Sequence, residues 1–116
     1  MKVKKFLGKN KMKKRNYDDS KIKAEEMLRS EMQFTKIEEN ISIIDDDCIK
    51  GNGFWIFFIN KNINIHEHDW FARQFCACVI GEYGGVRYMR DLRNNPTELQ
   101  KALDGLAISY GVDKRE

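Results

Sequence analysis

The chain of 116 residues contains a single proline and no low-complexity tract, which argues against a long disordered segment. It also lacks a secretory signal of the usual form, because Phe6-Leu7 is too brief for the apolar part of such a signal. Its longest apolar run is Phe54–Ile59, whereas a helix needs about 20 residues to cross a bilayer. We therefore expect one domain that stays in the cytosol.

Cysteine is also scarce, and recognisable catalytic motifs are missing. Three cysteines are an odd number, which does not suit a disulfide framework in a cytosolic chain. Gly51-x-Gly53 lacks the helix and the lysine that follow in a phosphate-binding loop. Asp45-Asp46-Asp47 lacks the spaced ligands and the central glycine of an EF-hand loop. We predict reduced core cysteines, no cofactor and no enzymatic activity.

The charge is distributed unevenly along the chain. Residues 1–15 hold eight of the 21 Lys and Arg side chains and no acid. This leaves 13 basic against 18 acidic side chains, a net charge of −5, in residues 16–116. The sequence therefore predicts a basic arm, residues 1–17, attached to a single acidic domain, residues 18–116. The arm has no helical apolar stripe, so its simplest interpretation is a mobile tail.

The arm also supports an alternative function. A basic arm can bind nucleic acid through contacts to phosphates, and the chain would then be a small phage- or plasmid-type regulator. No aromatic ladder or recognition helix accompanies the arm, so the pattern does not favour sequence-specific binding. On this hypothesis the contact residues are Lys4, Lys5, Lys9, Lys11, Lys13, Lys14 and Arg15.

The domain is predicted to form around Gly53–Asn60, where the large apolar side chains show no alternation. Aromatic and β-branched content favours a central strand that is covered on both faces. Consecutive side chains of a strand point to opposite faces. We expect one face to carry Phe54, Ile56 and Phe58, and the other to carry Trp55, Phe57 and Ile59.

Three further strands are expected beside the central one. Residues 41–49 precede it, and the Asn52-Gly53 turn should join the two strands as a hairpin. Residues 75–80 read as a second strand that is buried on both faces. Gly84-Gly85 then predicts a two-residue turn into a last strand over residues 86–89.

A helix is predicted at each end of the domain. Asp18-Asp19-Ser20 is a suitable N-cap cluster for a helix over residues 20–33. The apolar stripe of this helix is Ile22, Met27, Leu28 and Met32.

The second helix has clearer signals. Asn95 is its N-cap, Pro96 occupies the first helical position and Gly111 ends it. Apolar residues at helical spacing run from Leu99 to Tyr110. The order α-β-β-β-β-α indicates a small antiparallel α+β domain, with both helices on one face of the sheet. If nothing covers the Trp55 face, that face becomes a partner or dimer surface.

His66-x-His68 and Cys76-x-Cys78 are the candidate metal ligands. In an extended chain, residues two apart share a face, so each pair could present two ligands together. Thiolates combined with imidazoles select zinc. However, Cys76 and Cys78 fall in a strand that reads as wholly buried, and cysteine is among the most buried residue types. We favour core cysteines with surface histidines and keep zinc as the alternative.

Acidic side chains on predicted loops are the candidate contacts for a protein partner. An acidic surface steers association with a basic partner and raises the association rate. Nucleases are basic partners of this kind, because they need positive surface to hold phosphates. The candidate contact residues are Asp45, Asp46, Asp47, Glu67, Asp69 and Glu82.

The layout of about residues 22–108 combines a charged helix around Ala24–Leu28, a Trp-aliphatic-Phe strand at Trp55–Asn60, a strand-turn-strand segment at Cys78–Tyr88 and a closing helix. This layout resembles the small immunity proteins of bacterial polymorphic-toxin and contact-dependent-inhibition systems, in particular the immunity-protein-35 type. The resemblance implies a cytoplasmic protein that binds and neutralises a cognate toxin, often a nuclease. It implies no catalytic motif, and it assigns no contact residue in this chain.

Overall fold

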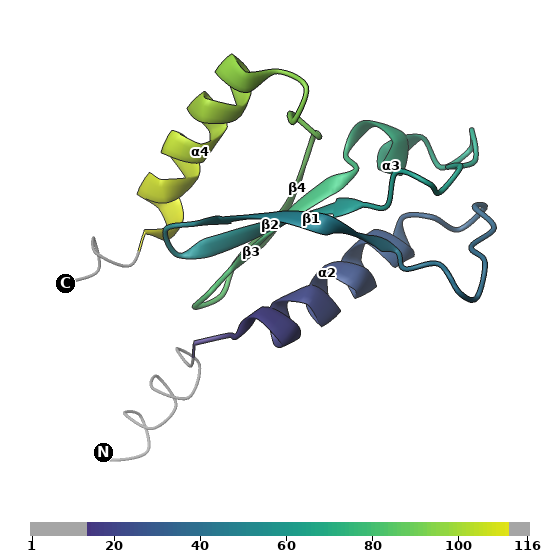
Figure 1. The fold of residues 1–116 in the computed structure, drawn as a ribbon, viewed down its shortest axis with the longest axis horizontal. Helices are drawn as coiled ribbons and strands as arrows, with labels where there is room; N and C mark the ends of the chain where they lie inside the picture. The colour runs from purple at the N-terminus through teal and green to yellow at the C-terminus, as the bar shows by residue number, and fades with distance from the viewer. Residues whose placement is uncertain (1–13, 112–116) are drawn as a thin grey trace, which may run out of the picture.

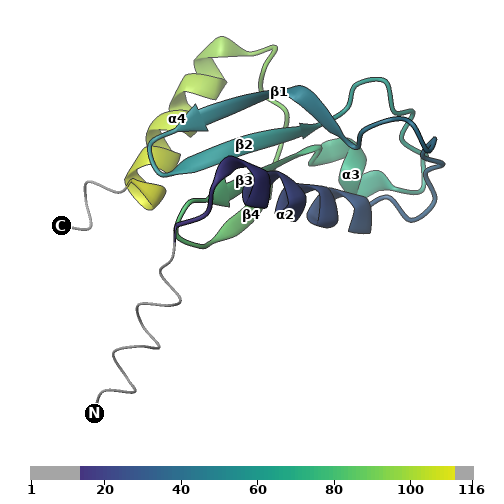
Figure 2. The same cartoon turned by 60° about the horizontal axis from the view of Figure 1, so that its bottom comes forward.

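The computed structural model describes residues 14–111, which form a four-stranded antiparallel sheet with helices on both sides (Figure 1). The strands lie side by side in chain order, as Figure 2 shows. This arrangement confirms the predicted antiparallel α+β class. The elements are α2 (Tyr17–Ser30), β1 (Ile44–Gly51), β2 (Phe54–Ile59), the short α3 (Trp70–Gln74), β3 (Ala77–Gly81), β4 (Val86–Met89) and α4 (Pro96–Tyr110).

The hairpin of β1 and β2 turns at Asn52-Gly53, as predicted. Gly51 pairs with Phe54 in antiparallel register, which leaves these two residues as the turn. Gly53 has a φ of +88°, and a Cβ added there would overlap the carbonyl oxygen of Tyr110. Glycine is required for both reasons, since other residues rarely adopt this φ and a backbone oxygen cannot move aside.

Both faces of β2 are buried, in the alternation that the sequence predicts. The cluster on one face is Phe54, Ile56, Phe58, Ala77, Val79, Leu106 and Tyr110. The cluster on the other face includes Ala24, Leu28, Met32, Trp55, Phe57, Ile59, Ala72, Cys78 and Ile80.

The two long helices therefore lie on opposite faces of the sheet, α4 above and α2 below in Figure 1. The expectation that they share one face was wrong. Because β2 and β3 are apolar on both sides, each face needs its own cover. α2 and α3 supply it on the Trp55 side, where Trp55 keeps only 8% of its surface exposed. That side is thus core and not a free partner surface.

α2 begins three residues earlier than predicted. The side chain of Asn16 accepts the N–H of Asp19 at 2.7 Å and is the N-cap. Ser20, the last residue of the predicted cap cluster, is instead buried within the helix. The buried face is Ser20, Ala24 and Leu28, at a spacing of four, while Ile22 is 55% exposed. Tyr17, which the prediction places in the basic arm, is thus the first residue of α2.

The connections around β3 also differ in detail from the prediction. Phe75 ends the short helix α3, and β3 starts only at Ala77. The connection between β3 and β4 spans residues 82–85, and the N–H of Gly81 bonds the carbonyl of Gly85 at 2.9 Å. Gly84 and Gly85 both have positive φ, but they form only half of this connection.

α4 matches its prediction closely. The side chain of Asn95 accepts the N–H of Glu98 at 3.2 Å, Pro96 opens the helix and Gly111 is the C-cap. Its contact with the sheet is concentrated at its C-terminal end, where Leu106 and Tyr110 are buried. None of the helices within residues 14–111 has the length and apolar content that a membrane crossing requires.

Candidate protein-binding surfaces

The aspartate triplet, which was expected to be on a loop, lies inside β1 (Ile44–Gly51). Ile44 pairs with Ile59, and Cys48 pairs with Phe57. Between these two pairs β1 therefore contains more residues than β2 does. This β-bulge lets the strand continue to Gly51 after the three carboxylates. β1 is an edge strand of the sheet. Asp46 and Asp47 are exposed, whereas Asp45 is half-buried.

Arg93 holds part of this acidic cluster together. Its guanidinium donates to Asp91 at 2.6 Å and to Asp45 at 3.4 Å, and it lies 4.0 Å from Asp47. Its Cζ also stacks 3.9 Å from the ring centroid of Phe58. The hydrogen bond from Arg93 lowers the pKa of Asp91, and the same bond raises the pKa of Arg93.

Asp46 and Asp47 therefore remain as the outward charges of this cluster, which we call the acidic edge: Asp45, Asp46, Asp47 and Asp91. A hollow of about 410 Å³ beside it is lined by Ser42, Ile44, Asp45, Asp46, Asp47, Asn60, Lys61 and Asn62. Arg93 and Asp91 were not among the predicted site residues. Their only local signal is the Asp91-x-Arg93 spacing, and it does not show which strand they approach.

Glu82 was predicted to be a solvated loop residue, but it is buried. Only 5% of it is exposed, and its carboxylate lies 3.3 Å from the ammonium of Lys50 and 3.9 Å from that of Lys14. Its carbonyl accepts the N–H of Arg15 at 2.7 Å. Lys14 and Arg15 are thus attached to the folded domain. The other candidate nucleic-acid contacts, Lys4, Lys5, Lys9, Lys11 and Lys13, lie outside the described residues.

Asp69 is also buried, with 5% of its surface exposed. Its carboxylate accepts the N–H of Phe34 and the hydroxyl of Thr35. Burial alone raises the pKa of Asp69, but the hydrogen bonds from Thr35 and Phe34 outweigh it and leave the pKa below its ordinary value. Among the predicted contacts in this region only Glu67 is exposed, with its carboxylate 3.9 Å from Nε2 of His68.

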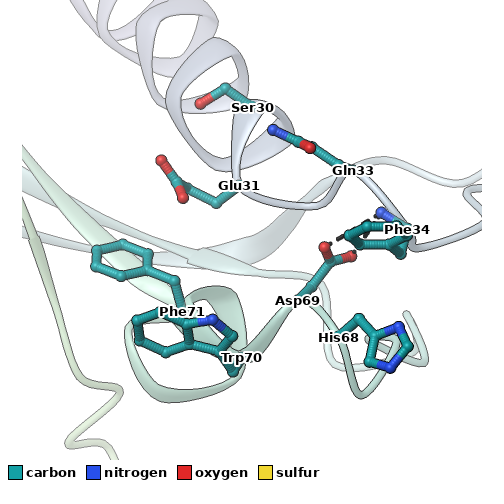
Figure 3. Close-up of a pocket in the computed structure, with 8 residues that line it drawn as sticks. All are labelled: Ser30, Glu31, Gln33, Phe34, His68, Asp69, Trp70 and Phe71. Atoms are coloured by element: carbon teal, nitrogen blue, oxygen red, sulfur yellow. Dashed lines mark hydrogen bonds between the residues drawn. The ribbon is translucent and has the colours of Figure 1, made fainter.

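The bond from Phe34 to Asp69 shapes a pocket between the end of α2 and the start of α3 (Figure 3). Phe34 and Trp70 are 58% and 64% exposed, which is unusual for residues of this size and apolar character. His66 and His68 pack against Phe34, with ring centroids 5.8 and 5.6 Å away. We call it the aromatic pocket; its lining is Ser30, Glu31, Gln33, Phe34, His68, Asp69, Trp70 and Phe71.

The aromatic pocket was not predicted from the sequence. Phe34 follows the predicted helix over residues 20–33, and Trp70 follows the polar segment that contains His66 and His68. The two positions are far apart in the sequence, and no local pattern brings them together.

The candidate zinc ligands lie in different surroundings. His66 and His68 are exposed, whereas Cys78 is buried opposite Phe57 and burial raises its pKa to about 12. Cys76 is partly buried, and burial raises its pKa as well. Within residues 14–111 no group of three or more His, Cys, Asp or Glu side chains has an arrangement that could hold a metal ion. The geometry thus gives the zinc alternative no support.

Comparisons of the chain with protein-family models, with curated proteins and with solved structures find no match, so the surfaces described above are the basis for a functional proposal.

Proposed function

We propose that the chain is a non-enzymatic binding protein of the immunity type, which neutralises a basic toxin in the cytoplasm, with a nuclease as the expected class. The observation that supports this function is the acidic edge, where Asp46 and Asp47 are exposed side by side on an edge strand. Residues 16–116 carry a net charge of −5, so the acidic edge belongs to a domain of the same sign.

The acidic edge has the properties that electrostatic steering requires. Three of its carboxylates lie in the bulge of β1, between the paired residues Ile44 and Cys48. Arg93 donates to both Asp45 and Asp91 and so ties these two side chains together. Fixed charges of one sign raise the rate at which an oppositely charged partner forms an encounter complex, and salt weakens the effect. A nuclease that holds phosphates presents such an opposite charge.

The proposal is tested by the kinetics of association with a toxin. It expects a secreted toxin encoded beside this chain, and the purified toxin domain is the probe. Exposed Asp46 and Asp47 are both changed to lysine, while Asp45 is kept because Arg93 depends on it. The expected result is an association rate lowered by about tenfold or more at low salt, with a weaker dependence on salt concentration.

A matched control separates the acidic edge from net charge. Glu26→Lys with Asp104→Lys changes the total charge by the same amount at exposed positions of α2 and α4. The control should slow association much less than the change at the acidic edge. Equal slowing by both variants, or a toxin domain that forms no complex with the chain, contradicts the proposal.

A further inference from the structure

The aromatic pocket carries an unbalanced negative charge. Two carboxylates line it, Glu31 and Asp69, and no Lys or Arg does. Glu31 accepts one long hydrogen bond, 3.3 Å from the hydroxyl of Tyr88, so its oxygens can accept further donors. Within the described ranges neither carboxylate has a Lys or Arg partner within salt-bridge distance.

The two exposed rings of the pocket also lack a cation. Elsewhere in residues 14–111, Lys50 lies over Trp55, Arg87 over Tyr110 and Arg93 over Phe58. The protein thus pairs three other rings with its own Lys and Arg side chains, while Trp70 and Phe34 are exposed and have no Lys or Arg over their rings within that part of the chain. Tryptophan is the ring that attracts a cation most strongly.

The size of the pocket limits what it can hold. Its volume is about 250 Å³, which is below the roughly 300–1,000 Å³ typical of sites for drug-sized ligands. One long side chain suits this space better than a cofactor does. Figure 3 shows Glu31 and Gln33 at the end of α2 on one side and the rings of Trp70 and Phe71 on the other. A chain that enters between them meets a carboxylate and an aromatic face together.

We propose that the aromatic pocket binds one lysine or arginine side chain of a protein partner, held by Trp70 and Phe34 as aromatic walls and by Glu31 as counter-charge. The identity of the occupant as part of a basic protein rests on the proposed function. The chemistry of the pocket does not, because it follows from the lining residues alone. Aromatic anchors in pockets of this kind contribute most of the binding energy at many protein interfaces.

Small probes test the pocket without a toxin. Nα-acetyl-lysine methylamide and Nα-acetyl-arginine methylamide are titrated into isotope-labelled protein, and the indole N–H signal of Trp70 is followed by NMR. Nα-acetyl-norleucine methylamide is the neutral probe of similar shape. The expected result is saturable binding at millimolar concentration, at least about fivefold tighter for the cationic probes.

Variants show whether the named residues are responsible. With the backbone amide signals of Phe34 and Phe71 as the readout, Trp70→Ala should abolish binding of the lysine probe, and Glu31→Gln should weaken it severalfold. Ile108→Ala is the control, because this side chain is 70% exposed on α4 on the other face of the sheet. Equal affinity for the norleucine probe, or an indole signal that no probe shifts, overturns the proposal.

The toxin complex then separates this inference from the proposed function. We expect Trp70→Ala to raise the dissociation rate from the toxin by about tenfold or more, as removal of an anchor residue does. Lysines at Asp46 and Asp47 could slow association while Trp70→Ala changes neither the association rate nor the dissociation rate. In that case the proposed function stands, and the proposal that a side chain of the toxin occupies the pocket is wrong. If the lysine probe binds but no toxin does, the proposed function fails and the cation site stands.

Discussion

The carboxylate of Asp69 accepts the backbone N–H of Phe34 with both oxygens, at 3.1 and 3.0 Å. Phe34 follows α2, and Asp69 precedes α3. This contact joins two segments on the same face of the sheet and fixes the backbone of Phe34 at the pocket that Trp70 also lines. A residue that the sequence suggests as a surface contact thus organises the aromatic pocket from within.

Replacement of Asp69 by asparagine should destabilise the domain and flatten its response to acid. The folded-state pKa of Asp69 lies below the unfolded value, so its contribution is complete above the unfolded pKa of about 3.9 and is lost as the pH falls through the folded pKa. The free energy of unfolding, measured in urea across a pH series, should differ between wild type and Asp69→Asn at neutral pH. The difference should shrink in acid.

Glu67→Gln is the control for this experiment, because Glu67 is exposed two residues away. It should leave the free energy of unfolding within about 0.5 kcal/mol of wild type. An Asp69→Asn variant as stable as wild type at neutral pH would show that the two bonds to Phe34 do not matter.

Arg93→Lys should cost about 1–2 kcal/mol of unfolding free energy, although it preserves the charge. Lysine cannot donate two bonds in a fixed fork to Asp91, as Arg93 does through Nε and Nη2, nor stack flat on Phe58. Urea unfolding measures the loss. Lys101→Ala is the control, since its ion pair with Glu98 is exposed and should contribute little. If Arg93→Lys lowers the free energy of unfolding no more than Lys101→Ala does, the contacts of Arg93 with Asp91 and Phe58 do not stabilise the domain.

The two glycine positions 105 and 53 should respond to alanine in opposite directions. At Gly105, in α4, no heavy atom of residues 14–111 outside the neighbouring helix backbone lies within 4 Å of an added Cβ, so Gly105→Ala should stabilise the protein by about 0.5–1 kcal/mol. Gly53→Ala should destabilise it by more than about 1 kcal/mol, because of its φ of +88° and the overlap with Tyr110. Thermal or urea unfolding compares both with wild type. A destabilised Gly105→Ala would mean that α4 packs differently.

Cys78 should react with a thiol reagent only when the domain unfolds. Burial raises its pKa to about 12, so the reactive thiolate is rare at neutral pH, and the side chain has no exposed surface. Cys48 and Cys76 are only partly buried and should react first. Disulfide-exchange kinetics of a Cys48→Ala, Cys76→Ala variant isolate Cys78. Reaction without denaturant at a rate near that of a free thiol contradicts its place in the core.

Much of the fold follows from local sequence signals. The apolar run Phe54–Ile59 forms the doubly buried β2, Asn52-Gly53 makes its hairpin turn and Asn95-Pro96 begins α4. Each of these signals acts over a few residues, through side-chain alternation, the φ that glycine permits or a cap bonding its own helix. Such short-range effects can be predicted from the sequence without knowing which distant residues lie nearby in space.

The surfaces depend on contacts between distant parts of the chain. Asp69 and Glu82 look like other loop acids in the sequence, yet each is buried because distant donors, Phe34 and Lys50, reach them. The placement of α2 and α4 on opposite faces also needs the whole sheet, since either apolar stripe could cover either side of β2.

The sequence by itself thus determined the two long helices, the four strands in outline and the alternation of the central strand, but not the short helix α3. Only the tertiary structure decided which carboxylates face water and that Phe34 and Trp70 share one pocket. The physical reason is the separation along the chain over which each effect acts. Turn, cap and alternation preferences are properties of neighbouring residues, whereas burial and ion pairing are set by whichever distant segment packs against them.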